Sequence, residues 1–162
     1  ASAETPVRGR ANTQGEPVPP AHRKIPFLWN QRIASVMNLL GNIIWLLFGG
    51  LAVAVEYFVS GLLLCITIIG IPFGFQAFKM GLLALFPFGQ TSVPSEQGTG
   101  CLCVLMNILW FFLGGIWIAL THLCFGLLLC ITIIGIPFGL QHFKLMRIAF
   151  TPFGREIVPT RP

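Results

Sequence analysis

GLLLCITIIGIPFG, residues 61–74 of the chain, recurs without a change at residues 126–139. Extending the alignment outward at the same offset of 65 residues pairs positions 42–89 with positions 107–154 without a gap, and 27 of these 48 pairs are identical. Agreement over that length does not arise by chance, so the chain contains two copies of one unit. Residues 42–89 are called the first copy below, and residues 107–154 the second copy.

Each copy holds about 40 mostly apolar residues, roughly twice the length that one membrane-spanning helix needs. The apolar runs are continuous rather than alternating, which excludes a membrane β-barrel. Because backbone groups in lipid must hydrogen-bond internally, we expect a helical hairpin in each copy. Residues 56–61 and 121–126 interrupt the apolar runs and are the expected turns. The sequence thus predicts an all-α membrane protein of two tandem hairpins, with about four transmembrane or re-entrant helices near 36–56, 60–80, 102–121 and 125–147.

The composition agrees with a membrane protein. Hydrophobic residues make up 55% of the chain, charged residues only 9%, and the mean hydropathy is +0.82. A soluble domain needs about a quarter of its residues charged to cover its surface. The net charge of +5 comes from residues that flank the apolar spans, without a basic stripe interleaved with aromatics. Nucleic acid is therefore not an expected partner, whereas membrane lipids are.

The positions of the basic residues predict an orientation. Both expected turns lack Lys and Arg, while the N-terminal segment and the end of each copy carry them. Four spans with both termini on the positive side satisfy the positive-inside rule, and the two copies then become parallel repeats about the membrane normal. The residues expected at the lipid headgroups are Trp29, Lys79, Lys144 and Arg147.

The IGIPFG segments at 69–74 and 134–139 predict a break in regular helix. Proline cannot donate a backbone hydrogen bond, and a nearby glycine eases unwinding. We expect a kinked second span in each copy, followed by short interfacial helices near 75–88 and 140–153. The expected helix-break residues are Gly70, Pro72, Gly74, Gly135, Pro137 and Gly139.

These features divide the chain into five parts. Residues 1–34 form a proline-rich basic arm that cannot build a core of its own and is expected to lie along a partner. Residues 35–89 and 101–154 are the two hairpin units, joined by a polar linker at 90–100 and followed by a tail at 155–162. Small residues expected to allow close helix packing are Gly50, Ala54, Gly115 and Ala119.

The chain resembles the YccF family of bacterial inner-membrane proteins. The resemblance rests on N-I-x-W-x-x-x-G-G at 42–50 and 107–115, on GLLLCITIIGIPFG, and on the Q-x-F-K and P-F-G that follow in each copy. It covers about 115 residues, and tandem units also occur in that family. The proline-rich arm departs from the pattern. The resemblance implies an inner-membrane location and supplies no reaction.

No catalytic, cofactor or metal site is expected, because the spans contain no set of positioned titratable groups. Cys101 and Cys103 point to different faces of a helix, and the other cysteines lie too far along the span to complete a tetrahedral site. With the expected turns, His122 lies at a hairpin tip and His142 near the opposite face, so the two cannot share a haem iron. Glu56 lies at the other tip.

Polar residues retained in both copies have two interpretations. Interhelical hydrogen bonds explain them, and the alternative is a polar pathway through the membrane. These residues are Asn42, Asn107, Gln76, Gln141, Thr67 and Thr132.

Two functions remain open. The first is a non-catalytic structural or accessory subunit of a larger inner-membrane complex, contacting other membrane-protein subunits partly through its arm and holding structural lipids. The alternative is a small oligomeric transporter or channel, suggested by the internal repeat. The start at Ala1 is compatible with removal of a presequence, which would extend the location to a mitochondrial inner membrane or a plastid membrane.

Overall fold

The computed structural model describes residues 21–95 and 100–160. It divides into two units, residues 38–161 and the residues before Asn38, and each unit is described by itself. Of the proline-rich arm, residues 1–20 lie outside the described part. The expected contact between this arm and a partner therefore stays a prediction.

The first helix, α1 (Ala21–Trp45), begins earlier than the expected boundary near residue 36. Residues 21–34, which the sequence placed in the arm and in no helix, are helical. Extending a helix adds one hydrogen bond per residue once the helix is nucleated, and Pro26, the sixth residue of α1, removes one of these bonds. The Ser35 hydroxyl donates a hydrogen bond to the backbone oxygen of Gln31 at 2.9 Å.

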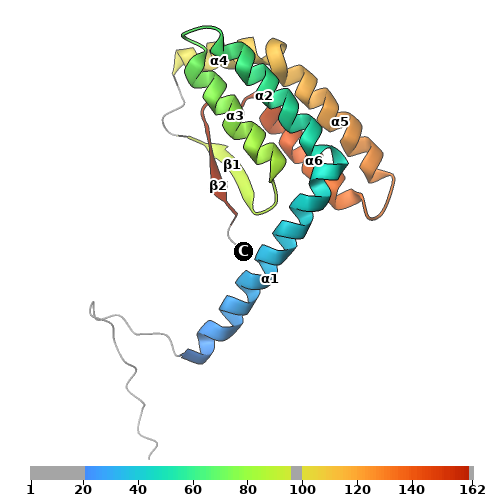
Figure 1. The fold of residues 1–162 in the computed structure, drawn as a ribbon. Helices are drawn as coiled ribbons and strands as arrows, with labels where there is room; N and C mark the ends of the chain where they lie inside the picture. The colour runs from blue at the N-terminus through green and yellow to red at the C-terminus, as the bar shows by residue number, and fades with distance from the viewer. Residues whose placement is uncertain (1–20, 96–99, 161–162) are drawn as a thin grey trace, which may run out of the picture. The chain divides into compact units, whose positions relative to one another are not determined.

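The first copy forms one helical hairpin. A π-helical segment, η1 (Leu46–Gly50), joins α1 to α2 (Leu51–Cys65), and α3 (Ile71–Leu85) packs back along α2. The second copy repeats the order with α4 (Cys101–Trp110), η3 (Phe111–Gly115), α5 (Ile116–Cys130) and α6 (Ile136–Phe150). The expected architecture of two tandem helical hairpins is confirmed (Figure 1).

The turns of the hairpins do not lie where the sequence predicted them. Residues 56–61 are inside α2 and residues 121–126 inside α5, whereas the chain turns at 66–70 and 131–135. The interruption expected at IGIPFG is confirmed, but it separates the two helices of each hairpin instead of dividing the second one. Pro72 and Pro137 lie in the first turn of α3 and α6, where a missing N–H costs nothing.

The number of long apolar helices also differs from the expectation. Among the described residues, two helical stretches are long and apolar enough to cross a membrane, Trp29–Cys65 and Cys101–Cys130. The helices α3 and α6 have 15 residues each. The sequence predicted about four transmembrane or re-entrant helices, and it could not tell whether the second helix of each copy crosses the bilayer.

A two-stranded ribbon joins the ends of the two copies. Strand β1 (Gln90–Pro94) lies in the expected linker, and strand β2 (Arg155–Pro159) lies in the expected tail. They pair antiparallel, with Gln90 opposite Pro159 and Pro94 opposite Arg155. Both strands follow a P-F-G turn whose glycine, Gly89 or Gly154, has a positive φ. The ribbon was not predicted, because it forms only when the two copies meet.

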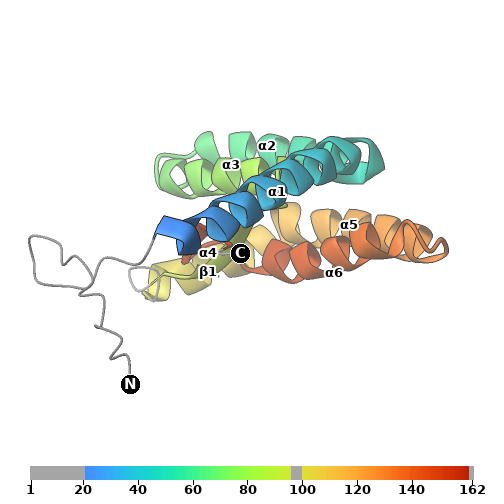
Figure 2. The ribbon, with the colours of Figure 1, turned by 90° about the horizontal axis from the view of Figure 1, so that it is seen from below.

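Both copies build the core with the same tryptophan. The Trp45 indole donates to the backbone oxygen of Ala84 at 2.7 Å, and the Trp110 indole donates to that of Ala149 at 2.9 Å. Both indoles are fully buried. The hairpins pack on each other mainly through α2 and α5, and Figure 2 shows them as two layers.

Candidate functional site

A buried histidine pair is the most distinctive polar feature of the unit at residues 38–161. His122 on α5 and His142 on α6 are both fully buried, and their Nδ1 atoms lie 2.8 Å apart. The prediction that they lie near opposite faces is wrong. Because the chain turns at 131–135, positions 122 and 142 stand at similar distances from the turn and meet across the hairpin.

The pair reaches from the second copy into the first through a break in helix. Phe48 and Gly49 leave helical geometry, with φ of −94° and +108°. The His142 Nε2 atom lies 2.9 Å from the Phe48 carbonyl oxygen at this break. A side chain on Gly49 would be strained by the positive φ and would meet the Phe125 ring at 2.8 Å.

The hydrogen bonds fix the tautomers of both neutral rings. A carbonyl only accepts, so His142 carries its proton on Nε2 and accepts at Nδ1. His122 must then donate from Nδ1, which leaves its Nε2 as an acceptor. That buried nitrogen has no hydrogen-bond partner among the described residues. His122 thus donates to His142, and His142 donates to the carbonyl oxygen of Phe48.

Aromatic rings enclose the pair. The Trp45 and His142 ring centroids are 4.2 Å apart, and the Phe125 ring stacks on His142 at 5.5 Å. Among the described residues, no group of three or more His, Cys, Asp or Glu side chains is placed to hold a metal. The arrangement suits a packed polar contact that caps the helix break.

The first copy has no such pair at the equivalent positions. Tyr57 stands in place of His122, and Ala77 in place of His142. Tyr57 stacks on Trp110 with ring centroids 5.8 Å apart. Gly114, the equivalent of Gly49, is not among the described glycines with positive φ. The helix break therefore occurs only once among the described residues, in the first copy, and the histidine that caps it comes from the second copy.

A second polar contact joins the copies where α2 meets α5. The Thr121 hydroxyl donates to Glu56 Oε1 at 2.6 Å, and these residues occupy equivalent positions in the two copies. Glu56 is half-buried inside α2, so the prediction that it lies at a turn in water is wrong. Its other carboxylate oxygen has no partner among the described residues.

The retained polar residues all make structural hydrogen bonds, with the exception of Gln141, for which no bond is described. Asn42 and Asn107 clamp the backbones of Phe88 and Phe153, each accepting from the N–H and donating to the C=O. Gln76 donates to the backbone oxygens of Pro152 and Arg155 in the second copy. Thr67 and Thr132 bond within their own turns. These bonds favour the packing interpretation over a polar pathway.

The other residues singled out in the sequence are placed as follows. Gly50 and Gly115 are buried beside Trp45 and Trp110, and Ala54 and Ala119 are buried on the same helices. Gly70 and Gly135 precede α3 and α6, while Gly74 and Gly139 pack against Cys65 and Cys130. Trp29, Lys79, Lys144 and Arg147 are exposed.

The fold defines a class of protein before any comparison: a helical membrane protein made of two duplicated hairpins. The YccF model, described as an inner membrane component domain, matches residues 40–90 and 105–155. The chain therefore belongs to the YccF family, and the resemblance drawn from the motifs is confirmed.

Two curated relatives carry the name inner membrane protein YccF. One is from Escherichia coli (strain K12) and the other from Shigella flexneri. Each is 30% identical over 130 residues, which covers 75% of this chain and 88% of the relative. No solved structure matches the chain. The family places the chain in the membrane and names no reaction.

Proposed function

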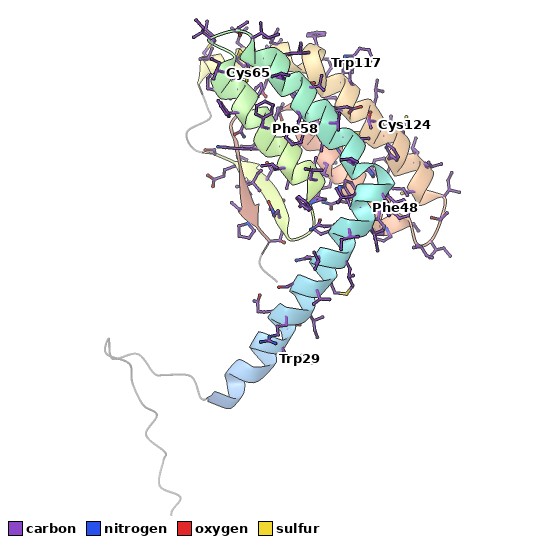
Figure 3. All side chains as sticks on the ribbon, viewed as in Figure 1. Trp29, Phe48, Phe58, Cys65, Trp117 and Cys124 are labelled. Atoms are coloured by element: carbon purple, nitrogen blue, oxygen red, sulfur yellow. The ribbon has the colours of Figure 1, made fainter. Side chains whose placement is uncertain are left out.

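We propose that the chain is a non-catalytic accessory component of a bacterial inner membrane, acting by contact with other membrane proteins. The supporting observation is the distribution of its apolar side chains. The core is filled by indole and aliphatic groups, while many large apolar side chains point outward. Leu47, Phe112 and Trp117 are between 62% and 82% exposed. Figure 3 shows Trp117 and Cys124 pointing away from the bundle.

Packing in the core disfavours the alternative of a transporter within one chain. A conducting route needs polar groups that line a continuous space. At the centre of residues 38–161, that space is taken by Trp45 and Trp110, both fully buried and hydrogen-bonded. The side chains of Asn42 and Asn107, which both copies retain, are hydrogen-bonded to backbone groups. A transporter would therefore need a pore between several chains.

An apolar groove on the second copy suits a lipid chain or a partner helix. It measures about 500 Å³ and is lined by residues of α4, η3 and α6, with Asn107 and Thr151 as its polar members. Phe112 borders the groove and is 69% exposed. This supports the expectation of structural lipids, which remains a proposal.

The location follows the relatives. Both named relatives are bacterial inner-membrane proteins, which supports a bacterial inner membrane for this chain. The mitochondrial and plastid alternatives rested on the residue at which the sequence starts, and they gain no support from the comparisons.

Purification from native membranes tests this function. The tagged chain is extracted in mild detergent and passed through affinity and size-exclusion columns, and the mass of the purified particle is measured. We expect a larger membrane protein at fixed stoichiometry. A particle that contains only copies of this chain would overturn the proposal and favour the oligomeric transporter.

Two matched variants show whether such a partner is specific. Trp117→Ala on α5 and Phe75→Ala on α3 remove aromatic rings that are 62% and 59% exposed. A partner that docks on one face is lost with one variant and retained with the other. If neither variant changes its recovery, the exposed aromatics face lipid only, and the contact proposed for them is wrong.

A further inference from the structure

The two hairpin turns carry isoleucines that no other described part of the molecule covers. Ile66, Ile68 and Ile69 are 78%, 86% and 66% exposed in the first turn. Their equivalents in the second turn, Ile131, Ile133 and Ile134, are 80%, 88% and 82% exposed. Turns in water are rich in Gly, Asn, Asp, Ser and Pro. Six exposed isoleucines at two chain reversals therefore indicate an apolar environment.

Polar groups in each turn also form hydrogen bonds within the turn, as is necessary in hydrocarbon, where no water can pair with them. The Thr67 hydroxyl donates to the Leu64 oxygen at 3.2 Å and accepts from the Gly70 N–H at 3.0 Å. Thr132 makes the same two bonds, at the same distances, with Leu129 and Gly135. The turns are built without a charged residue.

The exposed charges of the same unit lie away from the turns. Lys79 lies near the middle of α3 and lines a hollow with Arg155 and Glu156 of the ribbon. Lys144 holds the equivalent position in α6, and Arg147 lies one turn further on. These five residues, four exposed and Arg155 half-buried, are called the polar face below; Lys144 and Arg147 are assigned to it because α6 repeats α3. A helix rises about 1.5 Å per residue, so Lys79 stands roughly 12 Å from the start of α3.

The direction of the hairpins then limits how the unit can sit in a bilayer. Figures 1 and 2 both show the turn between α2 and α3 at one end of the helical layers and the turn between α5 and α6 at the other end. The polar face lies along the helices between these ends. If the bilayer normal ran along the hairpins, the polar face would fall near the middle of the hydrocarbon, where exposed charge is costly.

Helix length points the same way. The helices α2, α3, α5 and α6 have 15 residues each, a rise of roughly 22 Å against a hydrocarbon thickness of about 30 Å. If it stood along the bilayer normal, a hairpin of this length would not cross the hydrocarbon layer. The long stretch Trp29–Cys65 is broken at Phe48 and Gly49, whereas Cys101–Cys130 continues as helix through η3, so in the second copy the position of the charges decides the placement.

We propose that both hairpins are re-entrant: the polar face lies at one membrane surface, and both isoleucine turns lie within the hydrocarbon interior. The acyl chains of the bilayer then surround the exposed isoleucines of both turns. Neither turn reaches water on the far side, which replaces the expectation that the tips emerge opposite the termini. The two turns extend sideways in opposite directions from the ribbon.

Single cysteines at four exposed positions test this placement. The background carries serine at the two exposed native thiols, Cys101 and Cys124, and alanine at the three half-buried ones, Cys65, Cys103 and Cys130. Ile68→Cys and Ile133→Cys report on the turns, while Lys144→Cys and Glu156→Cys report on the polar face. A membrane-impermeant maleimide is applied to sealed right-side-out and inside-out vesicles, before and after detergent. Nitroxide labels at the same positions report collision with oxygen and with a water-soluble nickel chelate.

We expect the turn positions to react from neither side until detergent is added, with more collisions with oxygen than with nickel. The two polar-face positions should react from one common side. Reaction of residues 68 and 133 from opposite sides would show that the bundle crosses the bilayer lengthwise. Reaction of both turns from the side opposite residues 144 and 156 would restore four complete spans. Either result, or shielding of the polar face, overturns the proposal; circular dichroism and elution volume confirm folding.

Discussion

His122 and His142 face each other across the second hairpin with 2.8 Å between their Nδ1 atoms, and His142 also reaches the Phe48 carbonyl of the first copy. This contact spans 94 residues of sequence between Phe48 and His142. It is absent from the equivalent positions of the first copy, where Tyr57 and Ala77 stand. The duplicated chain has therefore become asymmetric at its centre.

Removing one member of the pair should destabilise the fold. His142→Ala leaves the Phe48 carbonyl and the His122 imidazole buried without partners and opens a cavity, at a cost of about 2–4 kcal/mol. Unfolding of the purified chain with SDS in mixed micelles measures this change in free energy.

The first copy supplies the control for that measurement. The double variant His122→Tyr/His142→Ala places the first copy's residues in the second copy. It contains no unpaired imidazole and fills part of the space, so it should recover stability relative to His142→Ala alone. A neutral His142→Ala variant would show that the hydrogen-bonded chain does not stabilise the fold.

Gly49 should be the least replaceable residue of the helix break. An alanine there must adopt a φ of +108° and place its Cβ 2.8 Å from the Phe125 ring. We expect Gly49→Ala to cost more than 1–2 kcal/mol, the approximate penalty of left-handed backbone alone. Gly100→Ala is the matched control, because nothing lies within 4 Å of the added Cβ. Equal midpoints of thermal unfolding for the two variants would contradict this account.

Replacing Asn42 or its equivalent Asn107 should lower the stability of the fold by the same amount. Asn42 bonds both the N–H and the C=O of Phe88, and Asn107 does the same for Phe153. Replacing either with leucine leaves two backbone groups unpaired, a loss of about 1–3 kcal/mol. Asn→Asp variants keep the acceptor but place a carboxylate oxygen against the backbone C=O, so they should cost at least as much as leucine at neutral pH. Unequal effects of Asn42→Leu and Asn107→Leu would show that the copies no longer use this clamp alike.

Much of the architecture could be predicted from the sequence, because the repeat and its apolar runs determine it locally. The turn positions could not. Glu56 looks like a helix interruption beside apolar residues, but Thr121 of the other copy satisfies one of its oxygens. Proline looks like a break within a span, but it begins the next helix. In both cases the deciding contact is tertiary and lies far away in sequence.

The histidine pair was missed for the same reason, because the sequence placed the turn of the second hairpin wrongly. Once the turn lies at 131–135, the pairing of His122 with His142 follows from counting residues back along two antiparallel helices. The signal was present, since histidines replace Tyr57 and Ala77 at two positions of an otherwise similar repeat. The break at Phe48 left no comparable mark, because both copies carry the same two glycines there.

The ribbon gives the last prediction. Backbone bonds from Thr160 to Gly89 and from Ser95 to Gly154 flank the strands, so the intervening pair Ser92 and Ile157 is not hydrogen-bonded. In such pairs the Cα atoms lie about 4.5 Å apart and side chains are close, as a disulfide requires. Ser92→Cys/Ile157→Cys should form an intramolecular disulfide under mild oxidation, seen as one cross-linked peptide pair by mass spectrometry. Ser92→Cys/Val158→Cys, one residue out of register and pointing to the other face, should remain reduced. If the second variant cross-links as readily as the first, the ribbon register is wrong, and with it the pairing of the two copies through their equivalent ends.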